Sequence, residues 1–241
     1  MEKQSLEFEI LPQPNESSCG PTCLHAVYRY YGDELPLAQV IDETHELKGG
    51  GTLDVFLACH AMRRGYRATI YTYNLQVFDP TWFIDDRYDL TQRLEAQRQA
   101  KEDEKLHIAT DGYLEFLSLG GTLRFEDLTS TLIRRYLRRG IPILTGLSAT
   151  FLYRSAREYG PTCDYDDIRG IPTGHFVVLC GYSKETREVR IADPLQNNPV
   201  APGQFYQTSI SRAMGAILLG IVTYDANLLI IEPRRRKTAE P

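Results

Sequence analysis

The chain has 241 residues, a formal net charge of -5 and a pI near 5.6. Its hydrophobic fraction of 42% is sufficient for a packed core. The acidic balance excludes a general basic surface for nucleic acid, and no apolar segment reaches the roughly 18 to 20 residues that span a bilayer. With no signal peptide at the N-terminus, we expect a cytoplasmic protein without a nucleic-acid or membrane partner.

The first part of the chain predicts mainly helices. We expect a short strand at 6–11, helices at about 19–31, 36–47 and 53–64, a strand at 66–74, an exposed helix within 86–106 and a helix at about 125–139. The second part predicts strands at 141–147, 175–181, 188–192, 216–224 and 228–232, with a long polar loop at 148–173. Helices first and strands last favour an α+β fold.

The domain organisation follows from the same order of elements. We expect one domain over residues 1–233, with a helical lobe at about 12–140 packed on an antiparallel sheet lobe at about 141–233. A basic tail at 234–241 ends the chain.

The five cysteines do not predict a disulfide framework, because their number is odd and their spacing is scattered. Cys23, Cys59 and Cys180 lie in apolar contexts and are expected to be buried. Cys19 differs, since it stands where a polar loop becomes a helix and is followed by Gly20 and Pro21. A helix N-terminus favours the thiolate form, which makes Cys19 a candidate nucleophile.

Partners for this thiol are found far along the chain. His175 follows Gly174 at the start of the most apolar predicted strand, so its backbone is held by the sheet while its ring is available. Asp193 ends the next predicted strand, and a hairpin between the two strands would place Asp193 beside His175, where it can orient the ring. The side-chain amide of Gln13, held between two prolines, is a candidate oxyanion donor together with the Cys19 N–H.

Three further positions are candidate substrate contacts. Ser18 makes the approach to the thiol polar, and Gly20 and Gly174 allow a substrate to come close to the backbone. No metal site is expected, because Cys19, Cys23 and His175 do not provide four zinc ligands, and no cofactor is implied.

These motifs resemble the peptidase C39 family, which has a papain-like fold. The resemblance is carried by Gln13 with Cys19-Gly20-Pro21-Thr22-Cys23-Leu24, by Gly174-His175-Phe176-Val177-Val178-Leu179 and by Ala192-Asp193-Pro194. It implies a cysteine peptidase in which Cys19 is the nucleophile, His175 the base, Asp193 its orienter and Gln13 the oxyanion donor. The Cys-Gly-Ser-Cys-Trp signature of papain itself is absent.

The resemblance does not fix the reaction or the substrate. We expect hydrolysis of a peptide or other amide bond through an acyl-enzyme; the alternatives are transfer of the acyl group to an amine, or peptide binding without catalysis. The stretches at about 85–122 and 148–173 are longer than a minimal C39 domain needs, so we expect them to shape a private substrate site.

Overall fold

The computed structural model describes residues 3–85 and 87–234. Nearly all of the predicted basic tail, residues 235–241, lies outside this part. The helices of the described residues are α1 (Cys19–Tyr30), α2 (Leu37–Glu43), α3 (Asp54–Arg63), α4 (Leu90–Ala100), α5 (Glu104–Ser118), α6 (Ser130–Leu137), α7 (Ala149–Tyr153) and α8 (Ile210–Leu219), with 3₁₀ turns η1 (Pro80–Phe83) and η2 (Gly220–Thr223). None of them is both long enough and apolar enough to cross a membrane.

One large sheet organises the molecule. Its strands are β1 (Lys3–Ser5), β2 (Tyr66–Thr72), β3 (Thr122–Arg124), β4 (Ile143–Ser148), β7 (Gly174–Ser183), β8 (Glu188–Ala192), β9 (Phe205–Ser209) and β10 (Asn227–Pro233). They are ordered β3-β2-β10-β4-β7-β8-β9, with β1 also pairing with β7. All pairs are antiparallel except β2 with β3. A separate small hairpin is formed by β5 (Glu158–Tyr159) and β6 (Asp164–Tyr165).

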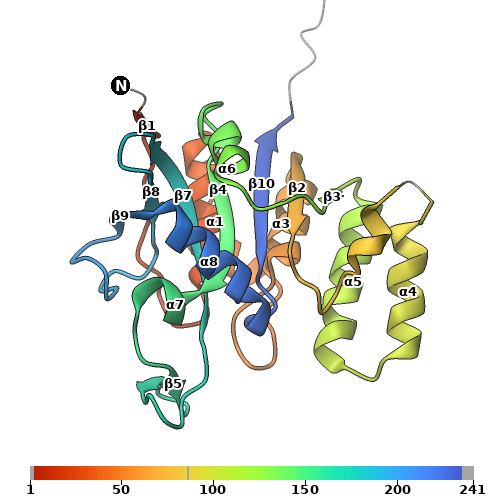
Figure 1. Cartoon of the computed structure of the whole chain (residues 1–241). Helices are drawn as coiled ribbons and strands as arrows, with labels where there is room; N and C mark the ends of the chain where they lie inside the picture. Colours follow the sequence, from red (N-terminus) through yellow and green to blue (C-terminus); the bar gives the residue numbers. More distant parts are fainter. Residues whose placement is uncertain (1–2, 86, 235–241) are drawn as a thin grey trace, which may run out of the picture.

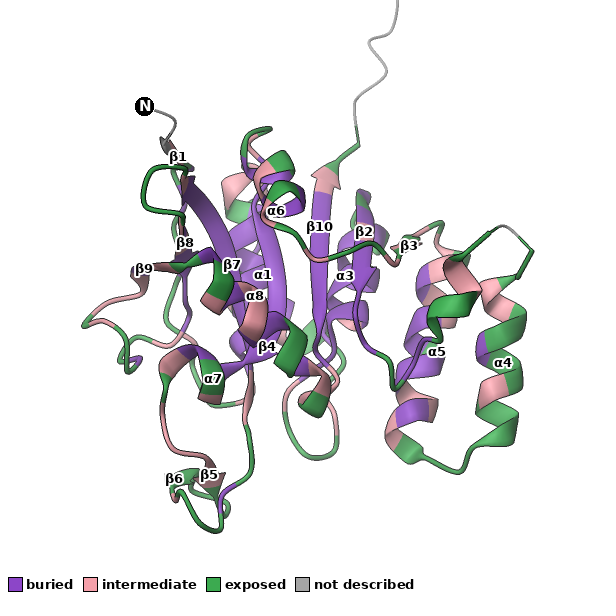
Figure 2. Cartoon of the chain, in the orientation of Figure 1, coloured by how far each residue is buried: buried purple, intermediate pink, exposed green. Residues whose placement is uncertain are grey.

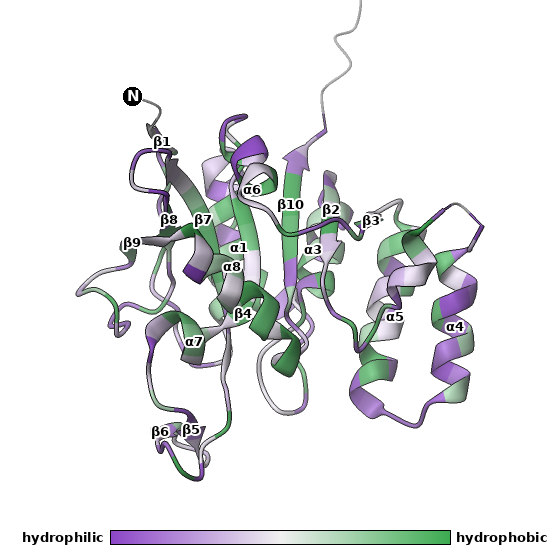
Figure 3. Ribbon diagram, viewed as in Figure 1, coloured by the Kyte–Doolittle hydropathy of each residue, from purple (hydrophilic) through white to green (hydrophobic). Residues whose placement is uncertain are grey.

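The central strands are covered on both faces. Figure 1 shows α1 and α3 behind the sheet and α8 in front of it, while the α4–α5 pair lies to the side beyond β2 and packs on α3 through α5. The middle of the sheet, β4, β7 and β10, is buried almost along its whole length (Figure 2). The same strands are the most apolar, whereas α4 is largely hydrophilic (Figure 3). Continuous apolar strands are expected where both faces of a sheet are packed.

The predicted α+β class is confirmed, and so are the central strand at His175 and its hairpin partner at Glu188–Ala192. The predicted division into lobes near residue 140 does not follow the sheet. From the first part of the chain, β2 and β3 join the sheet, and from the second part α7 and α8 pack on it. The cleft therefore has to be located from side chains rather than from a boundary between lobes.

Two predicted strands are wrong. Residues 216–224 belong to α8 and η2, because the buried residues Ile210, Ala213, Ala216 and Ile217 recur at helical spacing and Ser209 caps the first turn. Residues 6–11 alternate between buried and exposed side chains, but the ladder with β7 extends only to the hydrogen bond from Leu6 N–H to the Cys180 carbonyl, at 2.9 Å. The predicted loop at 148–173 contains α7 and the β5–β6 hairpin.

Candidate active site

Helix α1 begins at Cys19, and its N-terminus carries no side-chain cap. The hydroxyl of Ser18, the N-cap residue, donates to the Asn15 carbonyl at 3.0 Å instead of accepting from the helix. The uncapped N–H groups of a first helical turn form an anion-binding environment. Cys19 is 8% exposed, so its thiol lies in a largely desolvated position at this helix end.

The start of α1 is held against β7, the strand that carries His175. The Cys23 thiol donates to the Phe176 carbonyl at 3.3 Å. Gly20 packs against the side chains of Thr52 and Phe176, where an added Cβ would come within 2.8 Å of Thr52 Cγ2. Burial raises the pKa of Cys23 well above its usual value, so Cys23 stays a neutral thiol that joins helix to strand. Cys19 is thereby held close to His175.

The predicted hairpin brings His175 and Asp193 together. His175 Nε2 lies 2.8 Å from Asp193 Oδ1, and the aspartate side chain is fully buried. Because Nε2 is taken by Asp193, Nδ1 is the ring nitrogen available to the Cys19 thiol. The Tyr153 ring lies beside the imidazole, with 6.1 Å between the ring centroids.

Asp193 is surrounded by further donors. The hydroxyls of Tyr153 and Tyr206 donate to Oδ2 at 2.7 and 2.8 Å, and the Leu195 N–H donates to Oδ1 at 2.9 Å. Neither tyrosine was predicted from the sequence. The only signal for Tyr206 is its place opposite Ile191 in the β8–β9 pair, which cannot be known before the strand pairing is known.

These contacts set the protonation states of the pair. Burial would raise the pKa of Asp193, but the charge and hydrogen bond of His175 and the hydrogen bond from Tyr153 hold it below its usual value. Burial would likewise lower the pKa of His175, but the charge of Asp193, the hydrogen bond to it and the neighbouring Cys19 raise that pKa to about 10. His175 is therefore cationic at neutral pH and can stabilise a Cys19 thiolate.

Gln13 is anchored beside the same hairpin. Its N–H donates to the Pro194 carbonyl at 2.9 Å, and its side-chain Nε2 donates to the Asn15 carbonyl at 3.0 Å. The side-chain oxygen is buried and has no hydrogen-bond partner among the described residues. An amide NH₂ has two donors, so one N–H remains for a substrate oxygen. Gln13 itself is not part of the wall of the cleft described next.

A cleft of about 300 Å³ opens at the thiol. Cys19, Gly174 and His175 line it, so the structure places these three predicted site residues on one surface. Ser18 and Gly20 do not line it; both are buried behind the thiol. Lys105 and Asp225, which the sequence analysis did not single out, complete one wall. No group of three or more metal-ligating side chains occurs within residues 3–85 and 87–234.

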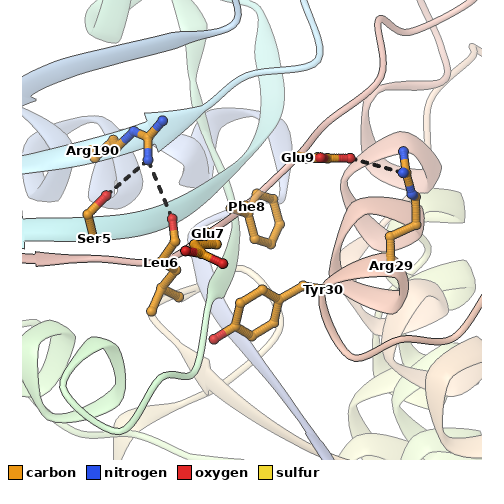
Figure 4. Close-up of a pocket in the computed structure, with 8 residues that line it drawn as sticks. All are labelled: Ser5, Leu6, Glu7, Phe8, Glu9, Arg29, Tyr30 and Arg190. Atoms are coloured by element: carbon orange, nitrogen blue, oxygen red, sulfur yellow. Dashed lines mark hydrogen bonds and ion pairs between the residues drawn. The ribbon is translucent and has the colours of Figure 1, made fainter.

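A wider hollow of about 660 Å³ lies away from the thiol, between the N-terminal segment and α1 (Figure 4). Its two arginines are already engaged. Arg29 pairs with Glu9 at 2.9 Å, and Arg190 donates to the Ser5 hydroxyl at 3.0 Å (Figure 4). No cysteine or histidine of the described residues lines this hollow.

The site and the fold define an α+β protein with a cysteine at the start of a helix and a histidine–aspartate pair held by two antiparallel strands. The model of the Peptidase_C39 like family matches residues 107–209, which confirms the resemblance to that family over this part of the chain. The matched segment includes His175 and Asp193 but neither Cys19 nor Gln13. The match supports a peptidase of the cysteine class.

Three solved structures are similar to the chain at 14% sequence identity. A double glycine motif protease from an AMS/PCAT transporter, in complex with its leader peptide, has a TM-score of 0.45 over 96% of this chain and 95% of that one. The peptidase domain of Streptococcus ComA has a TM-score of 0.44 over 95% and 100%. Xylellain, a cysteine protease from Xylella fastidiosa, has a TM-score of 0.46 over 97% and 86%. No curated protein matches the chain.

Proposed function

We propose that this protein is a cysteine peptidase or amidohydrolase that cleaves a peptide or other amide bond through an acyl-enzyme. The observation that carries the proposal is His175, which lines one cleft with Cys19 at an uncapped helix N-terminus and lies 2.8 Å from the buried carboxylate of Asp193. The family match over residues 107–209 supports the same class. The substrate class is a peptide or amide-containing molecule.

In the acylation step, the Cys19 thiolate, stabilised by the His175 imidazolium, attacks the carbonyl carbon of the substrate. The carbonyl oxygen becomes an oxyanion, which the Cys19 N–H and the Gln13 amide stabilise; losing one such donor costs about 3 to 4 kcal/mol in the barrier. The C–N bond then breaks, and the His175 imidazolium donates its proton to the departing amine. Asp193 holds the ring and remains an anion throughout.

In the deacylation step, water enters the position that the amine has left. His175 Nδ1 takes a proton from this water, which attacks the thioester carbonyl. Collapse of the second tetrahedral intermediate releases the carboxylic acid product and leaves the Cys19 thiolate beside the His175 imidazolium. Tyr153 and Tyr206 keep Asp193 ionised during both steps by donating to Oδ2.

The test uses the full chain and a mixture of peptides derived from a digested proteome, with new termini identified by mass spectrometry. Wild type is expected to produce new peptide termini, and Cys19→Ala none, while circular dichroism and thermal unfolding stay close to wild type. Cys163→Ala is the matched control, because Cys163 lines the same cleft but is exposed and lies on the 148–173 segment. Persistence of the cleavages in Cys19→Ala, or their loss in Cys163→Ala alone, contradicts the assignment of the nucleophile.

A further inference from the structure

A second buried acid lines the cleft, and nothing in the proposed mechanism uses it. Asp225 is 6% exposed and lies in the wall that also contains Gly174 and His175. We propose that Asp225 forms a cation-recognition subsite beside the thiol, where its carboxylate accepts a hydrogen bond from an ammonium or guanidinium group of the substrate. This inference deepens the proposed function and rests on it, because it concerns substrates that reach Cys19.

Two glycines on neighbouring strands leave room for the Asp225 carboxylate. Asp225 lies against two glycines on neighbouring strands, Gly146 in β4 and Gly174 in β7. A Cβ at Gly146 would lie 2.6 Å from Asp225 Cβ, and one at Gly174 would lie 2.5 Å from Asp225 Oδ2. Real Cβ atoms do not approach other atoms so closely, so both positions exclude any larger residue while Asp225 occupies its slot.

The slot provides few hydrogen bonds for the carboxylate. The Thr223 hydroxyl donates to Oδ2 at 2.7 Å, and no other described residue donates to either oxygen. A buried carboxylate is costly unless it is paired, whereas Asp193 nearby has four donors. Because Asp225 has only one donor within the described part of the chain, its carboxylate can still accept a hydrogen bond from a substrate group in the cleft.

The charged groups around Asp225 come from three elements. Burial raises the pKa of Asp225 most strongly, while the hydrogen bond from Thr223 and then the charges of Lys105 on α5 and His175 on β7 lower it, and the net value is about 7. Asp54 of α3 lies behind it and is itself coupled to its charge. Lys105 donates to the Thr223 carbonyl at 3.1 Å, and its Nζ lies 4.7 Å from the centroid of the Tyr224 ring, so it is held by the neighbours of Asp225 rather than by its carboxylate.

The net charge of the residues that line the cleft favours a cationic ligand. Among its lining residues, Glu16 and Asp225 are acidic and Lys105 is the basic one, while a Cys19 thiolate and a His175 imidazolium cancel each other. A substrate cation would gain a charge-assisted hydrogen bond in a partly desolvated place. A neutral side chain of equal length would leave the carboxylate without its second donor.

The experiment measures recognition at Cys19 without requiring a known substrate. Two chloroacetamides of equal length are compared, one with a 4-aminobutyl group on its amide nitrogen and one with a neutral pentyl group. In both, the Cys19 thiolate displaces chloride, and mass spectrometry of the Cys19 peptide gives each rate. We expect the ratio of cationic to neutral rates to fall about 10-fold or more in Asp225→Asn, since hydrogen bonds to charged groups are the strong ones. The rate with the neutral reagent should change little.

Two variants serve as controls. Glu16→Gln removes a different acid of the same cleft and should keep most of the ratio, whereas Lys105→Met removes the competing cation and should increase it. In wild type the ratio should also rise from pH 6 to pH 8, as Asp225 ionises. An unchanged ratio in Asp225→Asn, or an equal fall in Glu16→Gln, overturns the subsite. Because no turnover is involved, a failure to find peptide cleavage would overturn the proposed function and leave this result standing.

Discussion

A buried acid behind the cleft gives the most quantitative prediction. Asp54, the first residue of α3, is 1% exposed; its Oδ1 accepts from the Tyr113 hydroxyl at 3.4 Å, and its Oδ2 has no partner among the described residues. Burial, followed by the charge of Asp225, raises the pKa of Asp54 to about 8. The folded protein therefore binds a proton that the unfolded chain releases above about pH 4.

The sign of the effect on stability follows from this difference. The folded state holds more protons than the unfolded state between the two pKa values, so the free energy of unfolding falls as the pH rises through this window. One proton corresponds to about 1.4 kcal/mol per pH unit, which amounts to about 2.5 kcal/mol between pH 5 and pH 7. Asp54→Asn removes the titrating group and keeps its shape. From pH 5 to pH 7, the free energy of unfolding of the variant should therefore rise by about 2.5 kcal/mol relative to that of wild type.

The assay is urea unfolding of wild type and Asp54→Asn at pH 5, 6 and 7. Asp33→Asn is the matched control, because a hydrogen bond from Arg64 lowers the pKa of Asp33. The stability that Asp33 contributes is lost only as the pH falls through that lowered value. The difference in the free energy of unfolding between Asp33→Asn and wild type should therefore stay constant between pH 5 and pH 7. A constant difference for Asp54→Asn as well would refute the argument that Asp54 is protonated in the folded protein.

Two further predictions concern the neighbours of the cleft. Tyr206→Phe removes one donor to the anionic Asp193 and should lower the free energy of unfolding at pH 7 by about 1.5 to 3 kcal/mol, measured by chemical denaturation. A loss below about 0.5 kcal/mol, which is the size of most surface substitutions, would contradict an ionised Asp193. Gly174→Ala places a Cβ 2.5 Å from Asp225 Oδ2 and should slow alkylation of Cys19 and reduce stability, whereas Gly203→Ala, with open space around it, should do neither. Equal effects of the two alanines would contradict the crowding at Gly174.

The sequence predicted the parts of the fold whose patterns are strong and local. The run from His175 to Gly181 is apolar on both faces, which is typical of a central strand, and it lies in β7 between β4 and β8. The apolar run at 216–224 was misread as a strand, since a short run of this kind has no decisive period. Its helical character depends on the Ser209 cap and on burial against β4, which is a tertiary contact.

The candidate site was predictable where the type of a residue and its place in the sequence indicate a chemical role. Cys19 before a helix, and His175 and Asp193 at the ends of two strands joined by a turn, could be chosen from the sequence. Tyr153 and Asp225 could not, because each acts through a contact between segments that are distant in the chain. Asp225 reads as an ordinary turn residue, and only the pairing of β4 with β7 shows that two glycines make room for it.

The two halves of the site are joined by direct hydrogen bonds. The Gln13 N–H binds the Pro194 carbonyl, next to Asp193, and the Cys23 thiol binds the Phe176 carbonyl, next to His175. The relative position of thiol, imidazole and carboxylate therefore depends on the packing of α1 on β7 and on the β7–β8 hairpin, while Tyr153 of α7 and Tyr206 of β9 hold the carboxylate. Lys105 on α5 and Cys163 on the 148–173 segment reach the cleft from outside this unit. Changes in α5 or around Cys163 can alter what the cleft admits while leaving the reacting groups in place, whereas a change at Tyr153, in the same segment as Cys163, reaches Asp193 directly.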